Sequence, residues 1–481
     1  MSASGEVVSL NGDPPDTVAL LEDEGTDSAS LAEVSEQHAT GQRWSSSHKN
    51  LLEDFDQTHY GSDGSSGVDP ESQGTGKPPL VAKHLAGPCG AFLNYVKANI
   101  GSGILAMPYA FLQGGTILGS VSLLVVFGLA YMGIHLLVRT KHAYKGPVKL
   151  EEYGDLGEAA FGNNGRWMID IPLMFTQVGF CCAYLIFIGN TVAELVSPDD
   201  PDAQERWHYI FTAAAVPVLI PISWIRRIKL LTPFSAVSNV CFVVSFVVLF
   251  YNDFENISTE SIGGTNYADW VKFPIAMGIF TFAIEGIGLV LPIEDSLRNR
   301  RHFFPVLLSG FSMVLALVIS IGLLGYMSFG SRTKSLILDN LDSSPALATM
   351  VKVLLVFALT FTYPLQLWPV IKLTELRLFP VATTTHRVLK QNLWRSGLVV
   401  LSAGVAMAIP HFSEFISVVG SLGGSLLSFP FPALLHLTLA RPTRAQRILD
   451  ICLISFGLLV TVVCTVTSIM NLVEVMGSSK E

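Results

Sequence analysis

Two short stretches of the chain carry residues that could bind a ligand, and they resemble each other. GSGILAMP begins at Gly101, and GIGLVLP begins 185 residues later at Gly286. Each has two glycines around one residue, an apolar run and a proline, in the middle of a segment apolar enough to cross a bilayer. Because glycine tolerates backbone dihedrals outside the helical basin, we expect the membrane helix to unwind for a few residues at each stretch.

Unwinding leaves backbone groups without helical partners, which the bilayer interior tolerates only where they line a cavity or bind a ligand. The amides of Gly101, Ser102 and Gly103 would lie at the positive end of the following half-helix, where a carboxylate is favoured. The carbonyl groups of residues 98–100 would favour a cation, and the break at Gly286 would present the same two ends from the opposite side. The two breaks therefore predict a binding site for a zwitterion, that is, an amino acid.

Glu285 directly precedes the second break and is ionisable in the middle of an apolar segment. A carboxylate at this depth costs on the order of 3 kcal/mol on insertion scales, so such residues are usually functional. Because burial favours the protonated form, Glu285 is suited to proton coupling or to binding an amine. The alternative is a neutral carboxyl group that hydrogen-bonds freed backbone amides. Lys97, one turn before the first break, is either a structural counter-charge to Glu285 or a residue of the coupling or substrate site.

Four aromatic residues lie near the expected centre of the membrane domain: Tyr109, Tyr184, Phe282 and Tyr363. Phe282 is a candidate substrate-binding residue and the three tyrosines are possible pocket residues, and for each the alternative is ordinary packing. The sequence contains no phosphate-binding loop, no paired histidines with metal-ligand spacing and no nucleophile elbow. We therefore expect no enzyme activity, no catalytic residue, no metal site and no cofactor beyond a coupling proton.

Apolar helices must position these residues. Half of the 481 residues are hydrophobic and only 14% are charged, and the mean hydropathy of +0.48 is typical of a polytopic membrane protein. Apolar segments recur near residues 90–112, 114–138, 168–196, 208–225, 230–251, 272–293, 305–329, 346–371, 395–409, 415–439 and 449–473. The sequence therefore predicts an all-α membrane protein with eleven spans.

The two glycine stretches lie in the first and sixth predicted spans. Because five spans separate them, the two copies enter the membrane from opposite faces, as in an inverted repeat of five plus five helices. The first repeat would occupy residues 90–251 and the second residues 272–439, with an extra helix at 449–473.

The N-terminal region differs in composition from the rest of the chain. Fifteen acidic and three basic residues lie in residues 1–80, and apolar residues are sparse. This predicts a disordered acidic tail over residues 1–84, ahead of a membrane domain over 85–475, and argues against nucleic acid as a partner. Within the tail, DTVALL places Asp16 ahead of Leu20 and Leu21, which fits an acidic dileucine signal for sorting adaptors.

Basic residues set the expected orientation in the lipid bilayer. With a cytosolic N-terminus, roughly eighteen lysines and arginines fall in or beside cytosolic loops and only four on the other side, which places the C-terminus in a lumen or outside the cell. Asn256 begins an Asn-Ile-Ser glycosylation sequence in a loop on that other side. All six cysteines lie in or beside apolar segments, so we expect no structural disulfide.

Five stretches together resemble a known family: VKANIGSGILAMPYAF, YGDLGEAAFG, TQVGFCCAYLIFIGNT, FTFAIEGIGLVLPIED and LLGYMSFG. They are similar to the amino acid/auxin permease family, especially the proton-coupled amino acid transporters of animals and the vacuolar amino acid transporters of plants and fungi. The resemblance implies a LeuT-like fold and symport of small neutral amino acids with protons toward the cytosol. It also assigns the family's discontinuous-helix site to Asn99, Gly101, Ser102, Gly103, Glu285 and Gly286.

Three features depart from the family pattern. Asn94 stands where animal members often have a histidine associated with proton linkage, so coupling would depend on Glu285 or be absent. Ile284 replaces an aromatic residue that relatives often have before the glutamate, and the lumenal cysteines that form a disulfide in animal members are missing.

The resemblance to vacuolar members and the dileucine sequence together favour a vacuole or lysosome membrane over the plasma membrane. The alternative function is a nutrient receptor, in which amino acid binding is reported through the tail or the cytosolic loops with little flux.

Overall fold

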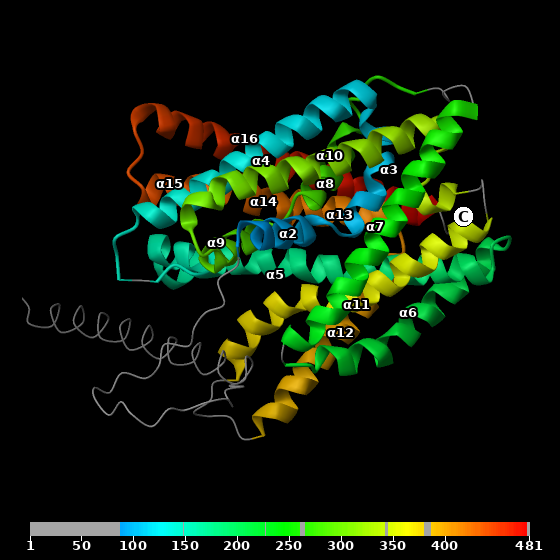
Figure 1. Ribbon diagram of the computed structural model, residues 1–481, viewed down its shortest axis with the longest axis horizontal. Coiled ribbons are helices and arrows are strands. Elements are labelled where there is room, and N and C mark those ends of the chain that lie inside the picture. Colours follow the sequence, from blue (N-terminus) through cyan, green and yellow to red (C-terminus); the bar gives the residue numbers. More distant parts are fainter. Residues whose placement is uncertain are drawn as a thin grey trace, which may run out of the picture. The chain divides into compact units, whose positions relative to one another are not determined.

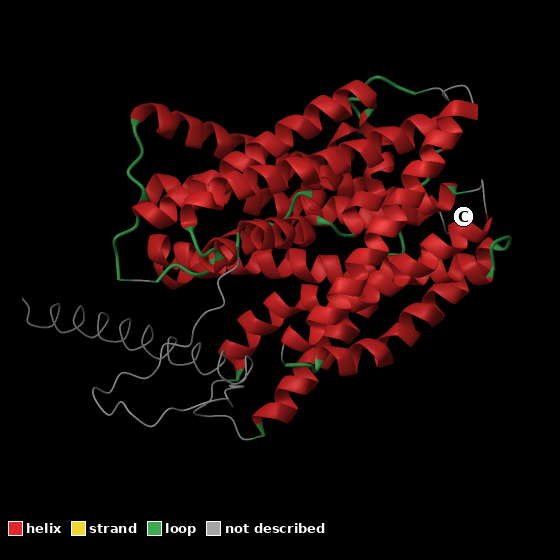
Figure 2. Ribbon diagram, in the orientation of Figure 1, coloured by secondary structure: helices red, strands yellow, loops and turns green. Residues whose placement is uncertain are grey.

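The computed structural model describes residues 87–147, 149–226, 228–259, 265–341, 345–379 and 386–478. The tail predicted for residues 1–84, with Asp16, Leu20 and Leu21, lies outside them. The described part of the chain is helical and contains no strand (Figure 2).

The helices follow the predicted spans in chain order (Figure 1). They are α2 (Pro88–Asn99), α3 (Met107–Gly114), α4 (Thr116–Ala143), α5 (Tyr153–Val196), α6 (Pro201–Ser223), α7 (Ile228–Thr259), α8 (Phe273–Ala283), α9 (Val290–Ser296), α10 (Phe303–Phe329), α11 (Pro345–Leu378), α12 (Arg387–Ala408), α13 (Phe412–Val419), α14 (Ser425–Ser428), α15 (Pro430–Leu439) and α16 (Arg444–Ser478).

Eight helical stretches of the described residues are long and apolar enough to cross a membrane by themselves. The other three predicted spans correspond to α6, to α12 and to the broken pair α2 and α3. The helix α12 begins eight residues before the predicted span 395–409. Hydropathy missed this start because the first turns of α12 carry Arg387 and Lys390 and are not apolar.

Both predicted breaks occur, and they have the same construction. After α2 the chain continues as the short 3₁₀ helix η1 (Ser102–Ala106) and then α3, and after α8 it continues as η2 (Ile287–Leu289) and then α9. The half-helix α2 packs beside α9, and α3 packs beside α8 (Figure 1). The four half-helices therefore form two pairs, as expected for two repeats inserted in opposite directions.

Two helices extend beyond the apolar segments that predicted them. The helix α5 begins at Tyr153, well before residue 168, with a capping box between Glu152 and Asp155 and a kink at Phe161 and Gly162. The helix α7 continues to Thr259, so Asn256 lies in a helix, where its Nδ2 donates to Asn252 Oδ1 at 3.1 Å. The loop expected around Asn256 is therefore wrong, because the helix continues past the end of the apolar segment.

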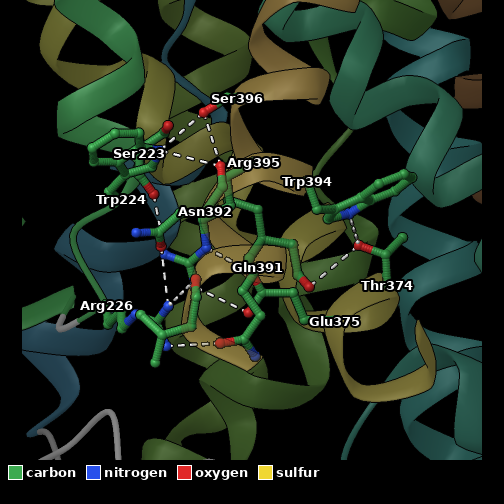
Figure 3. A network of polar contacts seen from close by, with 12 residues as sticks. Ser223, Trp224, Arg226, Thr374, Glu375, Gln391, Asn392, Trp394, Arg395 and Ser396 are labelled. Atoms are coloured by element: carbon green, nitrogen blue, oxygen red, sulfur yellow. Dashed lines mark hydrogen bonds and ion pairs between the residues drawn. The ribbon is translucent and has the colours of Figure 1, made fainter. Parts of the chain in front are cut away.

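A buried polar network joins α11, α12 and the turn between α6 and α7 (Figure 3). The fully buried Arg395 donates from Nε and Nη2 to both carboxylate oxygens of Glu375, at 2.6 and 3.0 Å. Its Nη1 donates to the carbonyls of Ser223 and Ile225, at 3.1 and 3.3 Å. Arg395 thereby satisfies carbonyl groups that the end of α6 leaves without a helical partner.

Serine and threonine hydroxyl groups attach the last helix, α16, to the helical stretch that precedes it. Four buried serines repeat every four residues along α13, the π-helical turn η6 (Gly420–Gly424) and α14: Ser413, Ser417, Ser421 and Ser425. Three of them bond to side chains of α16: Ser417 to Ser468 at 2.7 Å, Ser421 to Thr465 at 3.2 Å, and Ser425 to Thr461 at 2.6 Å. Hydrogen bonds across helices hold α16 in place, where hydrophobic burial provides no driving force.

Candidate functional site

The two breaks lie against each other and cross in opposite directions. A Cβ atom added to Gly286 would lie 2.6 Å from Asn99 Oδ1. One added to Gly103 would lie 2.9 Å from the Phe282 ring and 3.3 Å from Ala283 Cα. Asn99, at the start of the first break, therefore faces Gly286, at the end of the second. Gly103, in the first break, faces Phe282 and Ala283, at the start of the second.

Glycine is needed in these breaks for space, which corrects the reason expected from the sequence. The φ angles are −154° at Gly101 and −169° at Gly286, values that any residue adopts. At Gly103 and Gly286, by contrast, the distances above leave no room for a side chain. The glycines thus allow two backbones to approach closely, as small residues do at other helix contacts in membranes.

Each break contains a buried polar atom that has no hydrogen-bond partner among the described residues: Ser102 Oγ and Glu285 Oε1. Ser102 is fully buried, and only 5% of Glu285 is exposed. Leaving such an atom unsatisfied costs about 1–3 kcal/mol, and more for a charged group. Two atoms of this kind in facing breaks make the breaks the candidate site for a ligand or a proton.

Asn99 connects the first break to both of its neighbours. Its Nδ2 donates to the carbonyl of Tyr95 at 2.9 Å, which caps the end of α2. The same amide group occupies the space beside Gly286. Asn99 thus fixes the distance between the end of α2 and the second break.

The aromatic residues singled out from the sequence divide into two groups. Phe282 packs on Phe180 with ring centroids 4.4 Å apart, and the Tyr184 hydroxyl lies 3.3 Å from a Cβ added to Gly101, so Phe282 and Tyr184 adjoin the breaks. The hydroxyl of Tyr109 donates to Glu414 on α13 at 2.8 Å. The hydroxyl of Tyr363 lies 2.5 Å from Ser402 Oγ, between α11 and α12.

Lys97 is half-buried in the last turn of α2. In the described part of the chain it forms no ion pair with Glu285. The interpretation of Lys97 as a counter-charge to Glu285 is therefore not seen in this conformation.

The turn η6 also adjoins the breaks, which the pattern of residues did not predict. A Cβ added to Gly420 would lie 2.1 Å from the Gly278 carbonyl, and one added to Gly424 would lie 3.8 Å from Glu285 Cβ. The turn therefore packs directly on α8 and on the second break. The cluster of glycines in GSLGG, inside the predicted span 415–439, is the signal that could have indicated this close approach.

A groove of about 330 Å³ lies elsewhere, between α4, α8 and α16, and contains none of the candidate residues. Its lining is apolar and includes Val121, Met277 and Phe456. Since Val121 is largely exposed, this groove opens on the outer surface of the helices, and none of the candidate residues lines it.

Comparison with known proteins decides the family. Residues 86–470 match the model of a family described as transmembrane amino acid transporter protein. The chain belongs to this family. Its members are transporters, and with its membrane helices the chain is an integral membrane protein.

Curated relatives of the transporter cover most of its length. It is 29% identical to amino acid transporter AVT3B of Arabidopsis thaliana, over 85% of this chain and 100% of the relative, and 30% identical to AVT3A, over 82% and 91%. It is 31% identical to vacuolar amino acid transporter 4 of Saccharomyces cerevisiae, over 76% of this chain and 56% of the relative.

A solved structure is similar in fold. The crystal structure of MhsT in complex with L-phenylalanine matches with a TM-score of 0.50 and 12% identity, over 80% of this chain and 99% of that one. At this identity the similarity shows the fold alone. It confirms the predicted all-α, LeuT-like fold of five plus five inverted helices with an eleventh helix.

Proposed function

We propose that the protein is a secondary active transporter of small neutral amino acids, driven by protons and directed toward the cytosol. The observation that carries this proposal is the pair of facing breaks, each with one unpartnered polar atom, Ser102 Oγ and Glu285 Oε1. The names of the curated relatives, several of them vacuolar amino acid transporters, support the substrate class.

The breaks divide the binding of the amino acid between them. The amides of residues 101–103 begin a half-helix and receive the substrate carboxylate, while Glu285 receives the amine or a proton. Because Phe282 and Tyr184 pack beside the glycines of the first break, the site favours a small neutral side chain.

Coupling to protons depends on Glu285. When the site faces an acidic lumen, Glu285 takes up a proton; when it faces the cytosol, the proton leaves with the substrate, and the site returns empty. Lys97, one turn from the break on α2, is the second residue that we assign to coupling, since its charge would favour release of the proton from Glu285.

We place the transporter in a vacuole or lysosome membrane, with a cytosolic N-terminus. The vacuolar relatives and the sequence of Asp16, Leu20 and Leu21 support this location. Replacing both leucines by alanine should move the protein to the plasma membrane, and unchanged localisation would remove that argument.

Uptake into proteoliposomes tests the function. With a panel of labelled amino acids, we expect small neutral ones to accumulate when a pH gradient is imposed. Glu285→Gln should reduce this accumulation at least tenfold, since it removes the only group in the breaks that can carry a proton. Glu474→Gln, on an exposed face of α16, should transport normally.

Two other outcomes would change the proposal. If Glu285→Gln retained both affinity and proton dependence, the role of Glu285 would be wrong. If the wild type bound amino acids but carried none across the membrane, the alternative of a nutrient receptor would replace transport.

A further inference from the structure

The polar network around Arg395 contains more positive charge than its one carboxylate can neutralise. Arg395 takes both carboxylate oxygens of Glu375, at 2.6 and 3.0 Å (Figure 3). Arg226, in the turn between α6 and α7, donates instead to neutral groups of α12: Gln391 Oε1 at 2.7 Å, Asn392 Oδ1 at 3.0 Å and the Val388 carbonyl at 3.2 Å. In the described part of the chain, Arg226 therefore forms no ion pair.

Two further basic side chains lie at the start of α12, next to Arg226. Arg387 directly precedes Val388, whose carbonyl Arg226 binds, and Lys390 follows Arg387 by three residues, on the same face of the helix. Neither forms an ion pair with another described residue, and Arg387 Nε is a buried donor without a hydrogen-bond partner among them. An unsatisfied donor on a charged group is especially costly, so Arg387 is suited to an acceptor from outside the chain. We call Arg226, Arg387 and Lys390 the basic cluster.

The two segments that carry the basic cluster contain no acid of their own beside it. Residues 206–252 and 376–413 include no aspartate and no glutamate. Burial and then the Arg395 charge lower the pKa of Arg226, and Arg387 lowers it further, while Glu375 raises it. Like charges thus lie close together here, and an external anion would relieve their repulsion.

Apolar side chains surround the basic cluster on the outer surface of the helices. Val388, Leu389 and Leu393 are each more than half exposed on the first turns of α12. Trp224, at the end of α6, is also exposed, and its Nε1 donates to the Asn392 carbonyl at 3.2 Å. In a membrane protein, outward-facing leucines meet lipid, and tryptophan is common where hydrocarbon meets the headgroups. These residues indicate that the basic cluster lies at the level of the lipid headgroups.

We propose that the basic cluster binds the phosphate group of an anionic phospholipid, whose acyl chains lie along Leu389 and Leu393. A guanidinium group suits a phosphate because it donates two parallel hydrogen bonds. A free phosphate ion would find the same donors but would cover none of the exposed leucines, which favours a lipid. In the proposed orientation the cluster faces the cytosolic leaflet, where anionic lipids give the surface a negative potential.

Native mass spectrometry of the full-length protein in detergent measures the binding. We expect dioleoyl phosphatidic acid to bind at least about tenfold more tightly than dioleoyl phosphatidylcholine, which has no net charge. In the double variant Arg387→Gln with Lys390→Gln, the affinity for phosphatidic acid should fall at least about tenfold, since each basic residue near a membrane surface contributes about fivefold. The matched double variant Arg444→Gln with Arg447→Gln removes two exposed charges at the start of α16 and should bind as the wild type.

Two further measurements identify the place and the source of the phosphate. Phosphatidic acid with a photoreactive group in its acyl chain should label residues 386–400, and this labelling should be lost in the double variant of Arg387 and Lys390. Sodium phosphate at ten times the lipid concentration should leave the bound lipid in place.

None of these measurements requires transport, so the inference and the proposed function can fail separately. Equal affinity for the two lipids, or unchanged affinity in the double variant of Arg387 and Lys390, would overturn the inference. Displacement of the lipid by sodium phosphate would show a site for a free anion instead. A carbodiimide cross-link from Lys390 to an acid of residues 1–80, without lipid labelling, would show that the acidic tail occupies the cluster.

A single variant keeps the test decisive if the double variant does not fold. Lys390 is exposed, so Lys390→Gln removes one charge of the basic cluster without disturbing a buried contact. Its affinity for phosphatidic acid should fall about fivefold, and an unchanged affinity would contradict the proposal.

Discussion

At the scale of single residues, Gly286 shows how closely the two breaks fit. The Asn99 amide occupies the space where a side chain at Gly286 would begin, 2.6 Å away. Gly286→Ala must displace the Asn99 side chain, whose amide caps the end of α2, and so disturbs the groups that we propose bind the substrate. We expect amino acid affinity, measured by calorimetry on the purified protein, to fall at least tenfold, as misplaced binding groups commonly cause.

Two further variants distinguish crowding from general damage. Gly128→Ala adds the same methyl group on α4, where nothing lies within 4 Å, and should bind normally. Combining Gly286→Ala with Asn99→Gly removes the collision and should recover part of the affinity. If the double variant bound no better than Gly286→Ala alone, contact with Asn99 would not be the cause.

Some site residues could be predicted from the sequence because their type is unusual for their surroundings. Glu285 and the paired glycines are visible in this way in an apolar segment. The roles of Glu414 and Arg395 could not be predicted in this way, since each depends on a partner distant in the chain. Tyr109 precedes Glu414 by 305 residues, and Arg395 begins a predicted span with no sign that Glu375 and the end of α6 would surround it (Figure 3).

At the scale of helices, the row of serines on α13, η6 and α14 holds α16 in place. Ser425→Ala removes the hydrogen bond between Ser425 and Thr461 at 2.6 Å. The buried hydroxyl group of Thr461 then keeps only its bond to the Gly457 carbonyl. We expect the free energy of unfolding to fall by about 1 kcal/mol, within the range measured for such bonds between membrane helices. Thr467→Ala on the outer face of α16 loses only a bond within its own helix and should cost less. Equal losses in thermal unfolding would argue against the serine row as an attachment.

Helix positions could be predicted well wherever the bilayer imposes apolar residues, and poorly outside it. The spans matched by α4, by α10, and by α8 together with η2 and α9 needed little correction. The first turns of α5 and the end of α7 lie beyond the apolar segments, so hydropathy gave no sign that the helices continue. The turn η6 escaped prediction for another reason: it depends on contact with Gly278 of α8.

At the scale of the whole molecule, we expect the proposed transport cycle to separate α3 from α13 so that the site opens to one side. The hydrogen bond from Tyr109 to Glu414 opposes this separation. Tyr109→Phe should therefore increase amide exchange in residues 102–114, by up to about tenfold for a bond worth about 1.4 kcal/mol. Tyr209→Phe loses an exposed bond within α6 and serves as the control. Unchanged exchange in Tyr109→Phe would show that other contacts hold α3.

The contact between the breaks also limits how this transporter can evolve. Each break forms a wall of the other, since Asn99 bounds Gly286 and the Phe282 ring bounds Gly103. A mutation that enlarges one side chain is therefore harmful unless the opposite residue has already become smaller. We expect a deep mutational scan to find strong epistasis within these two pairs, so that a new substrate preference is reached by paired steps or through residues at the margin of the site, such as Ile284.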